Sequence, residues 1–129
     1  MDCDEEKTYE RIEDITEKIR ARTGIDNNAV TVRRAITASE TVVCAGYRQK
    51  NEFAIRDKRR IQIVDRVGSG DAFSAGIVYA HNKGLNVKDS VNFAAAADDF
   101  KHTVTKDINF ASVDEIRDIM NQTVNDVKR

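Results

Sequence analysis

The sequence lacks several features that mark particular classes of protein: it has no proline, no tryptophan and only two cysteines. Cys3 and Cys44 do not form a close CxxC pair, which argues against a disulfide framework and a zinc site, so we interpret both as free thiols. No apolar run approaches the roughly 18 residues that cross a bilayer, and the acidic start at residues 1–6 is unlike a secretory signal. These absences predict a cytoplasmic protein without membrane contacts.

An excess of charge of one sign is also missing, because the formal net charge is −1 although 33% of the residues are charged. Bulk attraction to nucleic acid is therefore not expected. The basic group at residues 56–60 is interrupted by Asp57 and has no interleaved aromatics, so we expect a solvated strand end. His81 and His102 lack an HxxxH or cysteine partner, so no metal ligands are predicted.

Hydrophobic periodicity predicts a first half that contains one helix and several strands. Apolar residues at helical spacing predict an amphipathic helix over residues 7–22, and Gly24 lies just beyond its end. Short β-branched segments separated by polar turns follow, and the turn at residues 48–51 predicts a hairpin. The predicted strand segments are residues 30–32, 41–47, 53–56 and 60–64.

The second half of the chain changes to helical character. A glycine turn leads into the small, apolar stretch 72–80, which predicts a buried helix. Residues 87–102 predict another helix, whose alanine run at 94–97 would let it pack closely on a neighbour. A capping box of Ser112 and Glu115 begins the last predicted helix. At 129 residues the chain fits one domain, and the mixture of elements favours the α/β class.

The glycine turn is the segment whose residues suit a catalytic site. Gly68 and Gly70 lie between a strand and a helix that begins near Asp71, so the N–H groups of Gly68, Ser69 and Gly70 gather at the positive end of a helix dipole. This arrangement predicts an anion site for a transferred phosphoryl group. Asp71 has two interpretations: a helix cap, which the local pattern alone favours, or a general base for an attacking hydroxyl group.

Other glycine-rich motifs do not fit this segment. The dinucleotide pattern GxGxxG fails because Phe73 stands where the third glycine would be. The Gly-Lys-Ser/Thr ending of a Walker loop appears nowhere in the chain. The glycines beside Ser69 are too close for a GxSxG nucleophile elbow, so Ser69 is not predicted to be a nucleophile.

The same segment resembles the second signature of the ribokinase-like (PfkB) carbohydrate kinases, DTxGAGDxFxAG. Arg66 replaces the common threonine, and this variant is similar to the 2-keto-3-deoxygluconate kinase branch. The flanking segments 30–33, 36–39 and 101–103 also resemble that branch. The signature positions that match are Asp65, Gly68, Gly70, Asp71, Phe73, Ala75 and Gly76.

This resemblance implies the C-terminal part of a ribokinase-like three-layer α/β fold, with residues 1–129 as a single, truncated ATP-binding and phosphoryl-transfer domain. The family's N-terminal part, which supplies most sugar contacts and a β lid, would be absent. A sheet cut in this way exposes apolar surface and an unpaired edge. We therefore expect a homo-oligomer or a complementary N-terminal chain to cover it.

The resemblance also implies roles for individual residues. Asp71 would be the catalytic base and would contact the substrate, beside an anion hole of Gly68, Ser69 and Gly70. ATP would bring Mg²⁺, which bridges the phosphate oxygens in this chemistry, with no dedicated metal cage in the protein. The implied substrate contacts also include Asp107 and Arg66, and the implied nucleotide contacts are Thr31, Arg33 and Asn92.

Two of these assignments have alternatives. Lys106 stands where the family has a glycine before the aspartate matched by Asp107, which changes the local backbone. Arg66 either steers an anionic sugar or phosphate, or forms a structural salt bridge to Asp65 or another carboxylate.

The function implied by the resemblance is ATP-dependent phosphorylation of 2-keto-3-deoxygluconate or a similar sugar acid. One alternative is a catalytically silent kinase fragment that binds nucleotide or a partner chain. Another is a kinase of the same family for a different sugar, such as fructose or ribose.

Overall fold

The computed structural model describes residues 5–103 and 112–126 and confirms the α/β class. Cys3 lies outside the described residues, whereas Cys44 is a buried free thiol, as expected. The elements, in chain order, are α1 (Glu5–Thr23), β1 (Asn27–Thr37), β2 (Glu40–Gln49), β3 (Glu52–Gln62), α2 (Ser69–Asn82), α3 (Val87–His102) and α4 (Val113–Asp126).

The three strands form one antiparallel sheet in the order β1-β2-β3. The predicted hairpin is confirmed: β2 and β3 pair from Gln49 opposite Glu52, and Lys50 takes the left-handed φ of 52° in the turn between them. The two segments predicted as separate strands at 53–56 and 60–64 belong to the single strand β3, which ends at Gln62.

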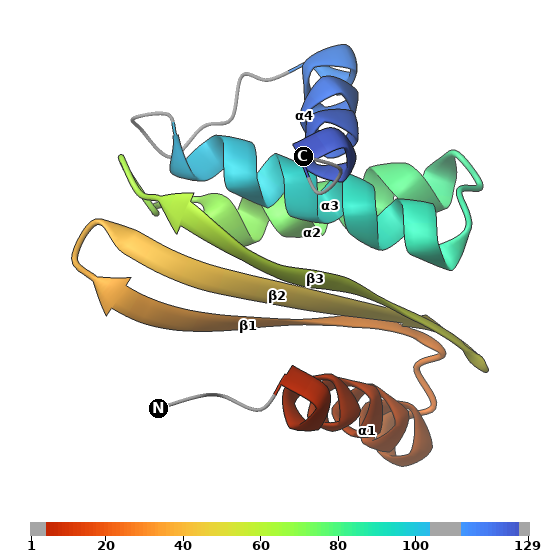
Figure 1. Ribbon diagram of the computed structural model, residues 1–129. Helices are drawn as coiled ribbons and strands as arrows, with labels where there is room; N and C mark the ends of the chain where they lie inside the picture. The colour runs from red at the N-terminus through yellow and green to blue at the C-terminus, as the bar shows by residue number, and fades with distance from the viewer. Residues whose placement is uncertain (1–4, 104–111, 127–129) are drawn as a thin grey trace.

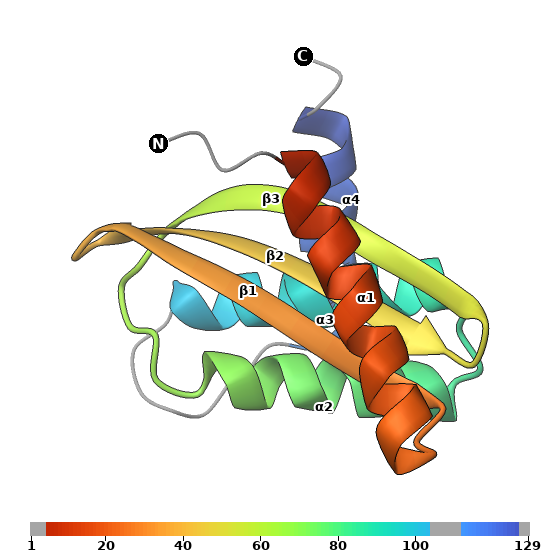
Figure 2. The same cartoon turned by 90° about the horizontal axis from the view of Figure 1, so that it is seen from below.

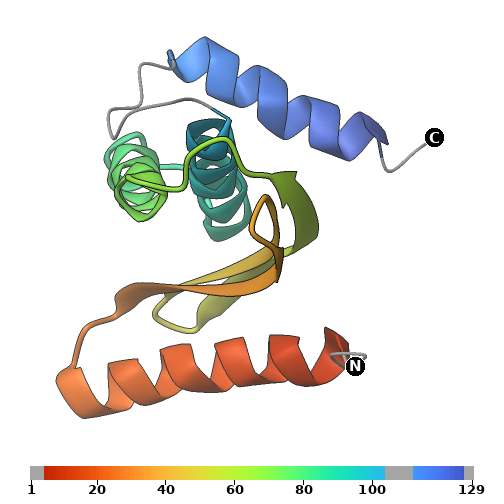
Figure 3. The same ribbon diagram turned by 90° about the vertical axis from the view of Figure 1, so that its left-hand side faces the viewer.

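Helices cover both faces of the sheet (Figures 1 and 3). α1 lies across β1 and β2 on one face, as Figure 2 shows. α2 and α3 lie on the other face, where α3 contacts β2 and β3, and α4 packs on the outer side of α3. The hydroxyl half of the predicted capping box is present, because Ser112 Oγ accepts the N–H of Glu115 at 3.2 Å.

The principal core lies between the sheet and the α2–α3 pair. Gly76 of α2 makes the close approach of the two helices feasible, since a Cβ added there would lie 2.6 Å from Ala94 Cα. The predicted role of the alanine run is thus confirmed. The buried residues of this core are Ala45, Tyr47, Phe73, Val87, Val91, Ala94 and Ala95.

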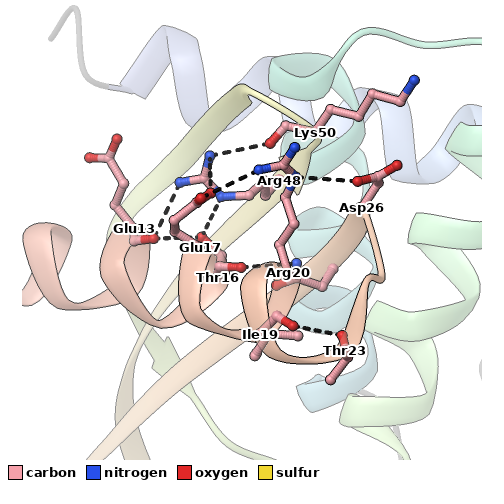
Figure 4. A network of polar contacts seen from close by, with 10 residues as sticks. Glu13, Thr16, Glu17, Ile19, Arg20, Thr23, Asp26, Arg48 and Lys50 are labelled. Carbon is pink, nitrogen blue, oxygen red and sulfur yellow. Dashed lines mark hydrogen bonds and ion pairs between the residues drawn. The ribbon is translucent and has the colours of Figure 1, made fainter.

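α1 is attached to the opposite face by the buried Arg48 of β2 (Figure 4). Its guanidinium donates to Thr16 Oγ1 at 3.0 Å, to the Glu13 carbonyl at 3.2 Å and to the Lys50 carbonyl at 3.4 Å. Glu17 lies 3.5 Å away and balances the charge. Every nitrogen of this buried guanidinium therefore has a partner, which makes its burial tolerable.

β3 departs from the expected solvated strand end, because Arg56 is buried and Arg59 is largely covered where the strand meets α3. The pairing register explains the difference. Ala45 lies opposite Arg56 and Val43 opposite Arg59, so the one residue between them on β2 stands opposite two residues of β3, and β3 bulges there. A bulge shifts the side-chain alternation by one position. Both arginines consequently face the helices, where Arg59 pairs with Asp99 and Arg56 lies 4.0 Å from the same carboxylate.

β1 is an edge strand of the described sheet, paired only with β2. Its residues from Thr31 onward are exposed, including the apolar Val32 and Ile36. Among the helices that the structure describes, none combines the length and apolar character that a membrane crossing requires.

Candidate active site in the turn before α2

The turn that leads from β3 into α2 is held at its start by α3 and at its end by Gly68. The carbonyl of His102 accepts the N–H groups of Val64 at 2.8 Å and Asp65 at 3.1 Å. Asp65 then folds back locally, since its Oδ1 accepts the N–H of Val67 at 3.0 Å. Gly68 has φ 84°, a left-handed conformation that favours glycine, and serves as the N-cap of α2. The helix therefore begins at Ser69, earlier than the predicted start near Asp71.

The backbone amides of this turn divide into engaged and free groups. Ser69 N–H donates to the Arg66 carbonyl at 3.2 Å and is part of the turn itself. Within the described part of the chain, the N–H groups of Gly68, Gly70 and Asp71 have no acceptor. A Cβ added at Gly70 would meet no atom within 4 Å, so the space beside that amide is open. The amide of Asp71, which sequence reasoning did not include, joins the two glycine amides as an available donor.

The carboxylate of Asp71 lies in the first turn of α2 and is exposed. The helix-cap interpretation is not supported, because the N-cap is Gly68 and no side chain caps this helix. No hydrogen bond or ion pair from the described residues reaches the Asp71 carboxylate. A free carboxylate beside free amides can accept a proton from a molecule bound in front of them.

A pocket of about 530 Å³ lies in front of Asp71, between α2 and β1. Thr31 reaches it from β1, so the structure brings this predicted nucleotide contact together with the turn. The pocket is lined by Ala29, Thr31, Gly70, Asp71, Phe73, Ser74, Ile77 and Val78.

Behind the turn lies a charged cluster that sequence reasoning missed. Arg33 Nη2 donates to Ser69 Oγ at 2.9 Å and lies 3.7 Å from Oδ1 of the buried Asp98. His102 is also buried, with Nδ1 3.6 Å from the same oxygen. Burial raises the pKa of Asp98, although the charges of His102, Arg33 and Arg59 and the hydroxyl of Ser69 act in the opposite direction. The sequence signal was an acidic residue directly after the alanine run of a buried helix.

The remaining predicted contacts are placed differently. Asn92 lies on the side of α3 that faces β3, where its carbonyl accepts a hydrogen bond from Arg56, and it is not part of the turn or its pocket. Arg66 is exposed in the turn, and within the described residues it makes no ion pair with Asp65. Asp107 and Lys106 lie outside the described residues.

A phosphate group suits the free amides at the start of α2, because helix N-termini bind such anions. Among the described residues, no group of three or more His, Cys, Asp or Glu side chains is arranged to hold a metal ion.

Solved structures of carbohydrate kinases resemble this chain. A 2-dehydro-3-deoxygluconokinase from Thermotoga maritima superposes with a TM-score of 0.81 at 28% identity, over 84% of this chain and 33% of that one. A PfkB family carbohydrate kinase from Listeria grayi gives 0.80 at 28% identity, over 84% and 34%. A candidate 2-keto-3-deoxygluconate kinase from Enterococcus faecalis gives 0.74 at 24% identity over 87% and 32%, which supports the fold alone.

The chain thus spans about a third of the length of these structures. No curated protein sequence matches it. The sequence profile of the pfkB family carbohydrate kinases matches residues 12–114, which is most of the chain and runs from within α1 to the start of α4, with the turn before α2 included. The chain therefore belongs to the pfkB family of carbohydrate kinases.

Proposed function

We propose that this chain is the ATP-binding and phosphoryl-transfer domain of a sugar kinase, with Asp71 as the general base. The observation that carries the proposal is the unpartnered Asp71 carboxylate, which shares a pocket with the open amide of Gly70 in a chain of the pfkB family. A cytoplasmic location suits an enzyme that consumes ATP.

In this mechanism the sugar hydroxyl gives its proton to Asp71 as its oxygen attacks the γ-phosphorus of ATP. A bond forms between that oxygen and phosphorus, and the bond from phosphorus to the bridging oxygen breaks to release ADP. The free amides of Gly68 and Gly70 hold the transferred group at the positive end of α2, together with the dipole of that helix. Bound Mg²⁺ supplies charge neutralisation on the phosphate oxygens.

The proposed substrate is 2-keto-3-deoxygluconate or a similar sugar acid. The support is the kinase from Thermotoga maritima at 28% identity and the exposed Arg66, whose guanidinium suits a carboxylate. Asp107 would contribute a further substrate contact and Thr31 would lie toward the nucleotide phosphates, whereas Arg33, predicted as a nucleotide contact, stands behind the turn and would act through Ser69. Asn92 is the weakest of these assignments, since its backbone carbonyl is engaged by Arg56 away from the pocket.

We further propose that the exposed edge of β1 receives the part of the kinase fold that precedes this region in the longer relatives. α2 and β1 border the same pocket, and α2 lies on the β1 side of the sheet (Figure 2). Val78 of α2 is 59% exposed beside that pocket. A strand with one unpaired edge next to exposed apolar surface is a typical place for another segment to dock.

This docking is tested by mixing the chain with the separately expressed preceding region of the Thermotoga maritima relative and measuring mass by light scattering. A one-to-one complex that protects β1 amides from hydrogen exchange supports the proposal. A homo-oligomer that protects the same amides, or a chain that stays alone, would contradict it.

The kinase proposal is tested by measuring ADP release with ATP, Mg²⁺ and a panel of 2-keto-3-deoxygluconate, fructose and ribose. Asp71→Asn should abolish turnover because the base is lost. Asp89→Asn is the matched control, since Asp89 is also an exposed acidic residue in the first turn of a helix, α3, and should leave turnover unchanged. Turnover with another sugar would correct the substrate. No turnover with any sugar, in the chain or its complex, would overturn the kinase proposal and favour a silent fragment.

A further inference from the structure

Arg33 connects three elements that meet behind the turn before α2. It leaves β1 on the face that carries α2 and α3, because its pairing partner Val43 lies two positions before Ala45, which belongs to the core on that face. Its Nη2 donates to Oγ of Ser69, the first residue of α2, at 2.9 Å. The same nitrogen lies 3.7 Å from Oδ1 of Asp98 on α3. One guanidinium therefore spans the sheet, the start of α2 and the last turns of α3.

Asp98 is the buried anchor of this connection. Only 1% of the residue is exposed, and neither carboxylate oxygen accepts a hydrogen bond within the described part of the chain. A buried carboxylate in this condition needs compensation from nearby positive charge. Arg33 from β1 and Arg59 from β3 supply it, and His102 of α3 adds to it when protonated. Arg33 is the member of this set whose side chain also contacts the turn.

The same helix holds the other end of the turn through its backbone. The carbonyl of His102 accepts the N–H groups of Val64 and Asp65, where the chain leaves β3. The turn is therefore fastened to α3 directly at its start, and through Arg33 at Ser69. Between these two points lie Gly68 and its free amide, and the free amide of Gly70 follows.

We propose that Arg33 is a positioning residue for the turn, held in place by Asp98, and that the pair keeps the amides of Gly68 and Gly70 aimed at the bound phosphoryl group. Donors that stabilise a developing charge work best when they are already oriented. Ser69 lies between the two glycines, so a hydrogen bond to its side chain limits the motion of both amides. The consequence for catalysis rests on the proposed kinase function, but the positioning itself does not.

The positioning is tested by amide hydrogen exchange in Arg33→Met. A hydrogen bond from a charged donor is worth enough that its loss should speed exchange at Ser69 and Ala72, the protected amides of the first turn, by about tenfold. Asp98→Asn should act in the same direction, and Arg33→Lys should be intermediate because lysine retains the charge without the planar fork. Arg34→Met is the control, since Arg34 is the next residue of β1 and projects from the opposite face.

Ala95 of the α3 core reports whether each variant is folded. Faster exchange at Ser69 and Ala72 with unchanged Ala95 supports the positioning role. Unchanged exchange at all three amides in Arg33→Met would overturn it. If Arg33→Met does not fold, Arg33→Lys decides the question on the same amides.

Two further readouts separate this inference from the kinase proposal. Titration with inorganic phosphate, followed at the amide resonances of Gly68 and Gly70, should show weaker binding in Arg33→Met than in Arg34→Met. In a protein that turns over sugar, Arg33→Met should lower kcat more than it raises KM for ATP, and Arg33→Lys should recover part of the loss. Faster exchange in a chain without any turnover would preserve the positioning role and reject the kinase function.

Discussion

The two faces of the sheet bury arginines in different ways. On the α1 face, the guanidinium of Arg48 donates three hydrogen bonds to neutral oxygens, and its charge is balanced by the half-exposed Glu17 (Figure 4). On the α3 face, Arg56 and Arg59 meet the carboxylate of Asp99, and several nitrogen and oxygen atoms of these three side chains find no hydrogen-bond partner among the described residues.

The α1 face stabilises its buried guanidinium by hydrogen bonds, whereas the α3 face relies on the opposite charge of a carboxylate. Burial lowers the pKa of Arg56 to about 10. For Arg59, burial and then the charge of Arg56 lower the pKa to about 9, against the opposing effects of Asp98 and Cys44. Both guanidinium groups remain charged at neutral pH, and the lowered values reflect the cost of removing these charges from water. On the α1 face every nitrogen of the buried guanidinium has a hydrogen-bond acceptor. On the α3 face stability depends on each charge having an opposite charge beside it.

The largest effect should come from breaking the charge balance of the α3 face. Asp99→Leu leaves Arg56 and Arg59 buried without their nearest carboxylate, and should lower the free energy of unfolding by about 3 kcal/mol. The double variant Arg59→Met/Asp99→Leu should recover part of that loss, because it removes one of the two charges left without a carboxylate, while Arg56 keeps its hydrogen bond to the Asn92 carbonyl. Urea denaturation of both variants measures the two values. A single variant as stable as the original chain would contradict charge-balanced burial.

A somewhat smaller effect is expected on the α1 face. Arg48→Leu removes the donors to Thr16 Oγ1 and to two carbonyls, and should lower the free energy of unfolding by about 2 kcal/mol. Lys18→Met is the control: the exposed Lys18–Asp14 pair, 2.8 Å apart, should contribute roughly 0.3 kcal/mol. Urea denaturation measures both variants. Equal losses of unfolding free energy in Arg48→Leu and Lys18→Met would show that the buried Arg48 contributes no more than a surface ion pair.

The two glycines of the turn test how far its conformation depends on the backbone alone. Gly68→Ala places a Cβ in the left-handed region and should destabilise the chain by about 1 kcal/mol. In Gly70→Ala the added methyl group meets no neighbouring atom, and the free energy of unfolding should change by less than about 0.5 kcal/mol. The same methyl group occupies space beside the free amide and should weaken phosphate binding. Thermal unfolding and phosphate titration of both variants measure these effects, and a stable Gly68→Ala would show that the turn tolerates another conformation.

The smallest expected effect is a gradual dependence on pH. Burial raises the pKa of Asp98 above its ordinary value of 3.8. The carboxyl group of Asp98 therefore stays protonated to a higher pH in the folded chain than in the unfolded chain. Stability is then greatest below the unfolded pKa and falls as pH rises from there through the folded pKa. Asp98→Asn should flatten this slope. Denaturation at a series of acidic to neutral pH values tests it, and identical slopes would show that Asp98 ionises freely.

Much of the fold could be predicted because its signals are local. The amphipathic spacing of residues 7–22 falls within α1, the polar turn at 48–51 lies between β2 and β3, and the alanine run packs against Gly76. The signature around Asp71 indicated the family, which the profile match then showed. Each of these signals depends on neighbouring residues, and helix periodicity, turn chemistry and close helix packing follow from them directly.

Contacts between distant segments were decided by the tertiary structure. Arg33 and Ser69 are 36 positions apart, and nothing in either segment indicates that they meet. Arg56 and Arg59 are buried because one bulge shifts the alternation of β3, a change that depends on its pairing with β2. The sequence by itself therefore determined the family, the helices and the glycine turn. Only the tertiary structure decided which charges are buried and which amides are free, because both depend on the register of paired strands and the packing of α3 behind the turn.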